Sequence, residues 1–338
     1  MIYPKFLEKG DRIGVTAPSD GNSNFLDYIR LDHGIDKLTS LGFPVVETPN
    51  VRTSIDGRSA DKKRRAEEFL SLIRHPKVKA IISAKGGDFL CEMLSLLDFD
   101  EIRANPKWMQ GYSDNTGILF TVTTACDMAT LYGNNFNDFG MDSWHESVIN
   151  DLELLKGNLV EQTSFDFHED EFHDKITGLE GYERDKKVYW QHTGEAKEII
   201  MKGRLIGGCL DVLLNLVGTR FDFVKSYVER YQKDGILWYL ESFETNREAI
   251  TRGLWQLKEA GWFAHASGFI FGRPCMYPSD SKVSYRAAVE ESLGELNLPM
   301  VFDADIGHKG PQFTVINGAY GCVYSGYGKG RFLQELRK

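Results

Sequence analysis

The sequence predicts an α/β protein with a parallel sheet in its first half, and three observations support this fold class. Between residues 12 and 132, short apolar strands alternate with helical patterns in a regular order. The strands are almost continuously apolar, as is typical of parallel strands that are covered by helices on both faces. The chain has 338 residues, and this length favours two domains because single domains usually span roughly 100–200 residues.

The expected elements of the first half follow one another without interruption. Strands are expected at residues 12–18, 44–48 and 78–83, directly before Ser113 and at 128–132, with helices at 25–41, 60–74 and 89–97 and directly after the Ser113 turn. In sheets of this kind, ligands bind beyond the carboxyl ends of the strands. The loops that contain Gly86, Gly87 and Ser113 follow such ends and are therefore candidates for a site.

Residues 142–200 interrupt the alternation because they are polar and acidic, and they predict a helix followed by a crossing between domains. Residues 203–218 then predict a glycine-punctuated helix start and an apolar helix. Further strands are expected at 235–241, 267–272, 299–303 and 313–316, and helices at 244–260 and 282–295. We therefore expect an N-terminal α/β domain over 1–160, a crossing over 161–200 and a second α/β domain over 201–338.

Composition and charge exclude several classes of protein. The formal net charge is −9, from 49 acidic and 40 basic residues, which disfavours binding to the phosphates of nucleic acid. The five cysteines are scattered without a C-x-x-C pair, as expected of free thiols in a reducing compartment. The N-terminus lacks the apolar core of a signal peptide, and no window approaches the roughly 18 apolar residues of a membrane span. We expect a cytoplasmic, soluble protein with no membrane partner.

One stretch stands out as a candidate for chemistry. Residues 107–117 predict a strand that ends in a Gly-x-Ser turn and passes directly into an apolar helix. A serine on such a bend exposes its hydroxyl next to the free N–H groups of the helix start, which suits a nucleophile whose intermediate carries an oxyanion. Ser113 would also suit an ordinary N-cap, so the motif alone leaves both interpretations open.

A serine nucleophile needs a base, and the base needs a carboxylate that orients it. Among the eight histidines, His308 is the best candidate because it lies in a glycine-flanked loop directly after an apolar strand. Glu241 ends the apolar strand 236–240 and would need a partner there, since burying an unpaired carboxylate is costly. The alternative for Glu241 is an acidic residue that favours the start of the next helix.

A glycine pair supplies the third part of the predicted site. Gly86 and Gly87 follow the strand 78–83, where their N–H groups and that of Asp114 could form an oxyanion hole. The same loop could cradle a phosphate, but the chain contains no G-x-G-x-x-G or Walker pattern. His168 and His173 would lie about 140° apart on a helix and so do not form an H-E-x-x-H zinc site. We expect neither a metal nor another cofactor.

Six segments of the chain occur in the order of a known family. They are Ala17-Pro-Ser19, the Gly86–Gly87 turn, Gly111-Tyr-Ser-Asp114, Arg204–Leu210, the strand end Leu240–Glu241 and Asp305-Ile-Gly-His308. Together they resemble the LD-carboxypeptidase family of serine peptidases, which includes the peptidases that confer self-immunity to microcin C. The resemblance extends over about residues 10–325.

The resemblance implies a flavodoxin-like or Rossmann-like N-terminal domain and a C-terminal domain of swivelling β/β/α type, with the active site at their junction. It implies that Ser113 is the nucleophile, His308 the general base and acid, and Glu241 the orienting carboxylate. The N–H groups of Gly87 and Asp114 would bind the oxyanion. Members of the family need no metal or cofactor, are usually cytoplasmic and often form homodimers.

The family divides by substrate, and the sequence leaves the branch open. One branch removes D-alanine from murein tetrapeptides, and the other cleaves the amide between an amino acid and a nucleotide in toxic peptidyl-nucleotides. The length of the segment between Asp142 and Lys202 is closer to the second branch, in which Trp190 could stack on a base and Gly86 could contact the substrate. Trp190 could instead anchor the crossing. Asp88-Phe89 stands where the murein enzymes usually have Tyr-Gly, which affects the shape of the acyl pocket.

Two other functions remain as alternatives to a serine-type carboxypeptidase or amidohydrolase. An esterase of the α/β-hydrolase type uses the same residue types in this order, but its G-x-S-x-G motif fails at Asn115. A non-catalytic two-domain protein that closes on a small ligand would need neither Ser113 nor His308. For the catalytic alternatives, the expected partner is a small peptide or peptidyl-nucleotide substrate.

Overall fold

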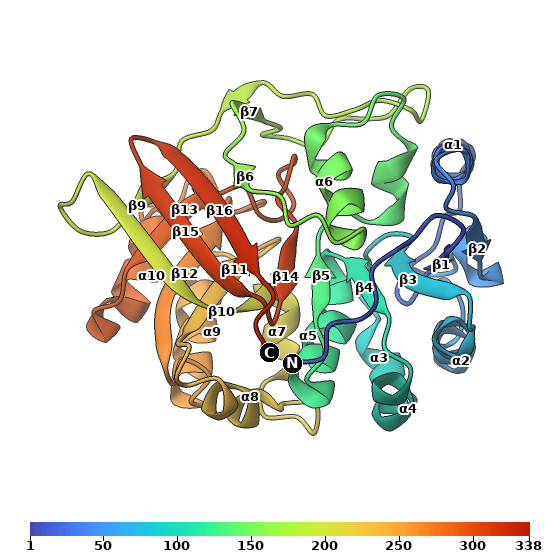
Figure 1. The fold of residues 1–338 in the computed structure, drawn as a ribbon. Coiled ribbons are helices and arrows are strands. Elements are labelled where there is room, and N and C mark those ends of the chain that lie inside the picture. Colours follow the sequence, from blue (N-terminus) through green and yellow to red (C-terminus); the bar gives the residue numbers. More distant parts are fainter.

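The computed structural model describes residues 1–338 and contains two large β-sheets that lie side by side with helices packed around them (Figure 1). The first sheet has the strand order β14-β5-β4-β3-β1-β2, in which β1 to β5 are parallel and β14 is antiparallel. The parallel α/β fold expected for the first half is therefore confirmed. The strands are β1 (Arg12–Thr16), β2 (Val45–Glu47), β3 (Val78–Ser83), β4 (Trp108–Gly111), β5 (Thr130–Tyr132) and β14 (Val315–Asn317).

Four of the six helices of the first half begin where a side chain caps their free N–H groups. Asn24 caps α1 and Asp61 caps α2, in each case through a side-chain oxygen. The helix expected over residues 89–97 is present but shorter, at Cys91–Leu94, and Asp98 accepts the N–H groups of Asp100 and Glu101 and starts a further helix that was not expected. The helices are α1 (Phe25–Ser40), α2 (Lys62–Arg74), α3 (Cys91–Leu94), α4 (Phe99–Ala104), α5 (Thr116–Cys126) and α6 (Glu146–Leu155).

The second sheet has eight strands in the order β6-β16-β15-β10-β11-β12-β13-β9, and its central strands β10 to β13 are parallel. Helices α7, α8, α9 and α10 pack with this sheet in the second half of the chain (Figure 1). The main strands are β10 (Glu198–Cys209), β11 (Ile236–Glu241), β12 (Ala266–Gly272), β13 (Met300–Ala304), β15 (Tyr320–Gly326) and β16 (Lys329–Glu335). The helices are α7 (Leu210–Leu216), α8 (Val224–Arg230), α9 (Arg247–Glu259) and α10 (Tyr285–Leu293).

The helix start expected from Gly203 onward is wrong, because this segment is the end of strand β10. A Cβ on Gly207 would lie 1.7 Å from the carbonyl oxygen of Tyr239 on the neighbouring strand β11. The glycines therefore allow close approach of two strands instead of marking the beginning of a helix. Helix α7 starts only after Cys209.

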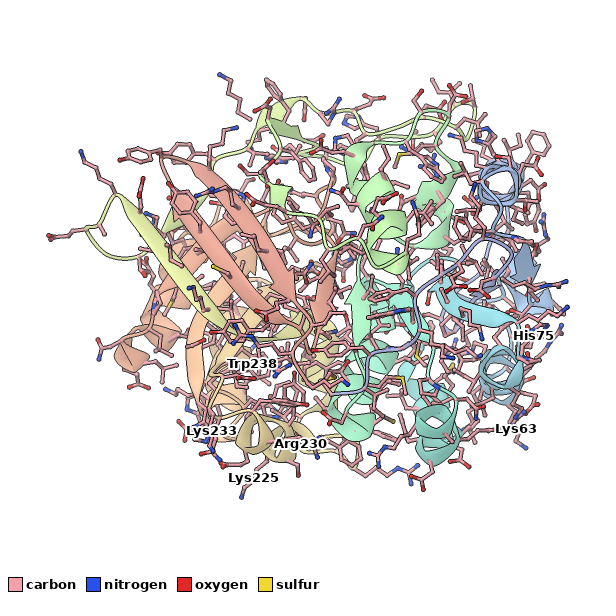
Figure 2. The ribbon with its side chains drawn as sticks, viewed as in Figure 1. Lys63, His75, Lys225, Arg230, Lys233 and Trp238 are labelled. Atoms are coloured by element: carbon pink, nitrogen blue, oxygen red, sulfur yellow. The ribbon has the colours of Figure 1, made fainter.

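Aromatic packing joins the two halves of the chain. Phe120 on α5 stacks on Trp262 with ring centroids 5.2 Å apart, and Trp262 stacks on Trp238 of β11 at 5.9 Å. Trp238 is fully buried inside the second half, whereas the labelled side chains of Lys63, His75, Lys225, Arg230 and Lys233 lie at the periphery (Figure 2). The helix that follows Ser113 is thus packed directly against the sheet that carries Glu241.

The crossing between α6 and β10 runs along one side of both sheets (Figure 1). Strand β6 (Gln162–Thr163) pairs with β16, β7 (Phe167–His168) pairs with β8 (Lys186–Lys187), and β9 (Gln191–His192) pairs with β13. Arg30 of α1 anchors the crossing by donating to the carbonyl oxygens of Gly178 and Glu180 at 2.9 and 2.8 Å. None of the helices combines the length and apolar character needed to cross a bilayer.

Candidate active site

Ser113 occupies a strained turn between β4 and α5. Its φ is +64°, which is uncommon for a residue with a side chain and costs energy that the surroundings must compensate. Asn115 holds the turn, since its Nδ2 donates to the carbonyl oxygens of Tyr112 and Lys85 at 3.0 and 3.1 Å. The strand, sharp turn and helix expected around Ser113 are all present, and the serine is half-buried.

Glu241 and His308 come together at the ends of neighbouring elements of the second sheet. Glu241 ends β11 and is fully buried, and its Oε2 lies 2.8 Å from Nδ1 of His308 in the loop after β13. Burial would raise the pKa of Glu241, but the facing His308 and the hydrogen bonds from His308 and Tyr132 hold that pKa below its usual value. The carboxylate is therefore ionised at neutral pH and orients the imidazole.

The second ring nitrogen of His308 has no partner. Nε2 is buried and makes no hydrogen bond, which is unusual for a polar atom in a native structure. The ring packs against Tyr112 at 5.2 Å and Phe243 at 4.5 Å between centroids. Because Tyr112 directly precedes Ser113, the imidazole lies next to the Ser113 turn with one nitrogen available.

Tyr132 is a site residue that the sequence reasoning missed. Its hydroxyl donates to Oε1 of Glu241 at 2.5 Å and accepts the backbone N–H of Ser113 at 3.3 Å. One hydroxyl therefore connects the serine turn in the first sheet with the carboxylate in the second sheet. Tyr132 ends the strand β5 directly beside β4, and that position at a carboxyl end was the signal that could have identified it.

Tyr132→Phe is expected to lower kcat by about 10- to 100-fold, because a hydrogen bond to a charged group contributes about 1.5–3 kcal/mol. The value of KM should change by less than about threefold, since the hydroxyl is buried behind the reacting groups. Steady-state kinetics measures both effects. Tyr231→Phe is the matched control, because Tyr231 donates to the carboxylate of Asp127 at 2.6 Å away from this site. Equal losses of kcat in both variants would contradict the role given to Tyr132.

The glycine pair lies against Ser113. A Cβ on Gly86 would lie 2.9 Å from both Cβ and Oγ of Ser113. Gly87 has a φ of +152°, and its N–H makes no hydrogen bond within the protein. Asp114 stands in the first turn of the short 3-10 helix that precedes α5, where backbone N–H groups lack intrahelical acceptors. The arrangement can therefore offer backbone donors beside the serine hydroxyl.

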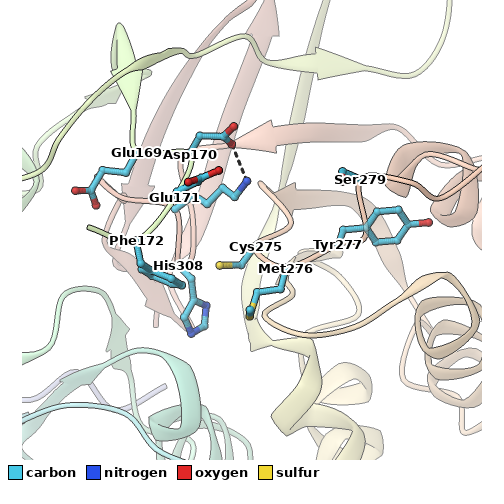
Figure 3. Close-up of a pocket in the computed structure, with 10 residues that line it drawn as sticks. Glu169, Asp170, Glu171, Phe172, Cys275, Met276, Tyr277, Ser279 and His308 are labelled. Carbon is cyan, nitrogen blue, oxygen red and sulfur yellow. Dashed lines mark hydrogen bonds and ion pairs between the residues drawn. The ribbon is translucent and has the colours of Figure 1, made fainter. Parts of the chain in front are cut away.

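Two cavities meet at His308. The larger, of about 460 Å³, is lined by Phe172, Cys275, Met276 and three consecutive acidic residues, and Figure 3 shows the His308 ring beside Phe172 and Met276. The second, of about 250 Å³, lies on the Tyr112 side and contains both charged and amide side chains. Glu169, Phe172 and His308 line both cavities. Glu169 and Phe172 belong to the crossing, so the crossing contributes to the site. The sequence did not predict a role for these two residues.

The acidic wall of the larger cavity consists of Glu169, Asp170 and Glu171. Asp170 is paired with Lys186 and Lys309 at 2.6 and 2.7 Å, and these partners hold its pKa at about 2 although burial alone would raise it. Lys309 is the only lysine or arginine that lines this cavity. The wall therefore keeps an excess of negative charge.

Trp190 does not offer a face to either cavity. Only 2% of the residue is exposed, and its Nε1 donates to Asp305 at 2.9 Å. The ring also covers Gly330, where a Cβ would lie 2.2 Å from it, and packs against Phe313 at 5.8 Å. Of the two roles that the sequence left open, the structure favours the anchor, because a buried indole cannot stack on a base.

Comparisons with known proteins identify the family of the chain. A family model described as the LD-carboxypeptidase N-terminal domain matches residues 13–133, and the model of the LD-carboxypeptidase C-terminal domain matches residues 202–323. The chain belongs to the LD-carboxypeptidase family. The two matches span most of the chain, and they assign Ser113 to the first domain and Glu241 and His308 to the second.

This LD-carboxypeptidase family member is similar over nearly its whole length to known relatives. It is 29% identical to a putative carboxypeptidase of Vibrio cholerae, covering 96% of this chain and 95% of the relative. It is 27% identical to the microcin C7 self-immunity protein MccF of Escherichia coli, covering 91% and 89%. The structure of MccF in complex with aspartyl sulfamoyl adenosine superimposes with a TM-score of 0.81 at 24% identity, covering 99% of both chains. These similarities confirm the two-domain fold and place the chain among enzymes.

Proposed function

We propose that Ser113, His308 and Glu241 form the catalytic triad of a serine peptidase that hydrolyses an amide bond. The observation that carries the proposal is the Glu241–His308 pair of 2.8 Å whose remaining nitrogen, Nε2, is buried without a partner next to the Ser113 turn. A buried imidazole that is oriented on one side and free on the other is the arrangement a general base requires.

The reaction begins when Oγ of Ser113 attacks the carbonyl carbon of the substrate amide and Nε2 of His308 takes the hydroxyl proton. Ionised Glu241 accepts the Nδ1–H of His308 and stabilises the imidazolium that forms. The oxyanion of the tetrahedral intermediate accepts hydrogen bonds from the N–H groups of Gly87 and Asp114. His308 then transfers its proton to the leaving nitrogen, the C–N bond breaks and the acyl group stays on Ser113.

Water completes the cycle. With the amine gone, a water molecule gives a proton to Nε2 of His308 and attacks the ester carbonyl of the acyl group on Ser113. The second tetrahedral intermediate uses the same backbone donors. When it collapses, the C–O bond to Ser113 breaks, His308 returns the proton to Oγ, and the carboxylic acid product leaves.

The cavities support a small substrate with a positively charged portion. Their volumes of about 460 and 250 Å³ suit a short peptide or a nucleoside derivative, and both open at His308. The excess of carboxylates at Glu169–Glu171 favours an ammonium group, such as the side-chain amine of the diamino acid in a murein peptide. The likeness to MccF bound to aspartyl sulfamoyl adenosine favours an aminoacyl-nucleotide, so both substrates enter the test.

The test is mass spectrometry of two parallel digests, each with the wild type and with Ser113→Ala. One digest contains a murein tetrapeptide that ends in D-alanine, and the other contains aspartyl sulfamoyl adenosine. Release of D-alanine by the wild type alone would identify a murein L,D-carboxypeptidase, and release of aspartate would identify an immunity-type amidase. Product formation by Ser113→Ala at the wild-type rate would contradict the proposal.

The resemblance to the family supports three further parts of the proposal. We infer that the enzyme acts in the cytoplasm, that it forms a homodimer and that its substrate arises from cell-wall recycling or from a toxic nucleotide conjugate. The proposed organisation keeps the N-terminal domain at 1–160, the crossing at 161–200 and the C-terminal domain at 201–338. Light scattering of the purified chain tests the dimer directly.

A further inference from the structure

We propose that the side chain of Asp114 is a positioning residue, which holds the Gly86–Gly87 loop in place beside the nucleophile turn. This inference rests on the proposed function and extends it, because it gives a role to a buried carboxylate that the triad does not use. It also gives a role to Ser19, which belongs to the first of the six sequence motifs.

A single oxygen of Asp114 connects three loops. Asp114 is only 6% exposed, and its Oδ2 accepts the hydroxyl of Ser19 at 2.5 Å and the N–H of Leu90 at 2.9 Å. Ser19 lies in the loop after β1, and Leu90 lies three residues beyond Gly87 at the far end of the glycine loop. The nucleophile turn is therefore tied to both neighbouring loops through one carboxylate.

The glycine pair is held at two ends. At its near end, Nδ2 of Asn115 donates to the carbonyl oxygen of Lys85 at 3.1 Å. At its far end, Asp114 accepts the N–H of Leu90. Arg65 is fully buried and donates to the carbonyl oxygens of Pro18 and Phe89 at 3.0 and 2.9 Å, so it joins the two outer loops to each other. Within the nucleophile turn, only the side chains of Asp114 and Asn115 form hydrogen bonds to the glycine loop.

The glycine loop is packed tightly between Ser19 and Ser113 and has little room to move. A Cβ on Gly87 would lie 2.4 Å from Oγ of Ser19, and one on Gly86 would lie 2.9 Å from Oγ of Ser113. The loop thus fills the space between the two serines. A donor that is held at the oxyanion position is worth about 10²- to 10³-fold in kcat, so a small displacement of the Gly87 N–H reduces the rate.

Burial sets the charge of Asp114 near neutral pH. It raises the pKa of Asp114 to about 6, and the hydrogen bonds from Ser19 and Leu90 oppose this shift. Among the charged groups that face the carboxylate, Asp88 raises its pKa and Arg65 lowers it, while the nearby Cys91 thiol has its own pKa raised by burial. The ionised carboxylate is the stronger acceptor for both hydrogen bonds. Protonation of Asp114 therefore loosens the loop.

Stability and activity should respond to Asp114 in opposite directions. Because the native pKa is raised, the folded protein binds more protons than the unfolded chain between about pH 4 and 6, and ionisation lowers stability as the pH rises through this window. At pH 8, Asp114→Asn is therefore expected to keep or raise Tm while it lowers kcat. A residue with a merely structural role would lower both together.

The experiment compares Asp114→Asn, Asp114→Ala, Ser19→Ala and the double variant Ser19→Ala/Asp114→Ala with the wild type. At pH 8 we expect kcat to fall about 10-fold in the asparagine variant and about 10²-fold in the alanine variant, with KM within about threefold. The double variant should cost little more than Asp114→Ala, because both changes break one connection. The ratio of kcat between the wild type and Asp114→Asn should rise through about pH 6 and then level off, since only the wild type carries the Asp114 carboxyl that ionises over this range.

Asp222→Asn is the control, because Asp222 accepts the Nε1–H of Trp262 and the N–H of Gly218 at 3.0 and 2.9 Å far from the site, and its kcat should not change. The exchange rate of the backbone amide hydrogens of residues 85–90 reports on the mobility of the loop without a substrate. This rate should be higher in Asp114→Ala than in the wild type. Unchanged exchange in that variant, or wild-type kcat in Asp114→Asn at pH 8, would overturn the inference. If the wild type hydrolyses no amide but hydrogen exchange is still faster in Asp114→Ala, the proposed function would be wrong and the positioning role of Asp114 would remain.

Discussion

Ser113→Ala and His308→Ala should each lower kcat by at least about 10³-fold, while the double variant should be almost no slower than either single variant. The reason is that the two side chains act in one step, in which Oγ attacks only as Nε2 takes its proton. Once either group is lost, the other has nothing to contribute. The remaining activity comes from substrate binding and the backbone donors at Gly87 and Asp114.

Kinetics and thermal unfolding of the three variants check this prediction. Ser113→Ala should keep a Tm close to that of the wild type, since Ser113 is half-buried, whereas the variants without His308 should have a lower Tm, because they leave the buried Glu241 without its partner, but should still unfold cooperatively. His75→Ala serves as the control histidine, because His75 lies at the periphery after α2 (Figure 2). If the double variant lost the product of the two single effects, the residues would act independently and the triad would be contradicted.

Glu241→Gln should lower kcat by about 10³- to 10⁴-fold. Glutamine has nearly the same shape, but its amide nitrogen cannot accept the Nδ1–H of His308. The imidazole would then turn or change tautomer, and Nε2 would no longer be the basic nitrogen facing Ser113. The loss should appear in kcat, because Glu241 is fully buried and does not contact the cavities.

The pH dependence of stability separates this effect from unfolding. In the native protein the pKa of Glu241 is lowered, so its ionised form stabilises the fold above the unfolded-chain pKa of about 4.3, and this stabilisation is lost as the pH falls further. In Glu241→Gln, the loss of stability that comes from protonation of Glu241 at acid pH should be absent. The variant should still unfold in one cooperative transition near neutral pH. A variant that stays folded with kcat within tenfold of the wild type would contradict the role of Glu241.

The fold could be predicted from the sequence wherever local patterns were decisive. The alternation of apolar strands and helices gave the parallel sheet of the first half, because periodicity reflects burial directly. The prediction failed at Gly203–Cys209, where glycines permit contact between β10 and β11. That contact joins segments about 30 residues apart, and no local pattern reports it. It also failed to foresee that β14, near the C-terminus, extends the first sheet.

The site shows the same division between local and distant information. The Ser113 turn, the strand end at Glu241 and the loop of His308 each carry a local signature. The roles of Tyr132 and Phe172 depend on contacts with residues far along the chain, so only the structure places them at the site. Trp190 was visible as an aromatic residue, but its burial against Gly330 could not be read from its surroundings in the sequence.

Labelling with a fluorophosphonate, followed by peptide mass spectrometry and assay of amide hydrolysis, reports directly whether Ser113 is an activated nucleophile. Such a reagent phosphonylates a serine whose hydroxyl is activated by a neighbouring base. We expect one adduct, on Ser113, with activity lost in proportion to labelling and with little labelling of His308→Ala or Glu241→Gln. An enzyme that keeps its full activity with Ser113 completely labelled, or that loses activity through an adduct elsewhere, would contradict the role of Ser113 as the nucleophile.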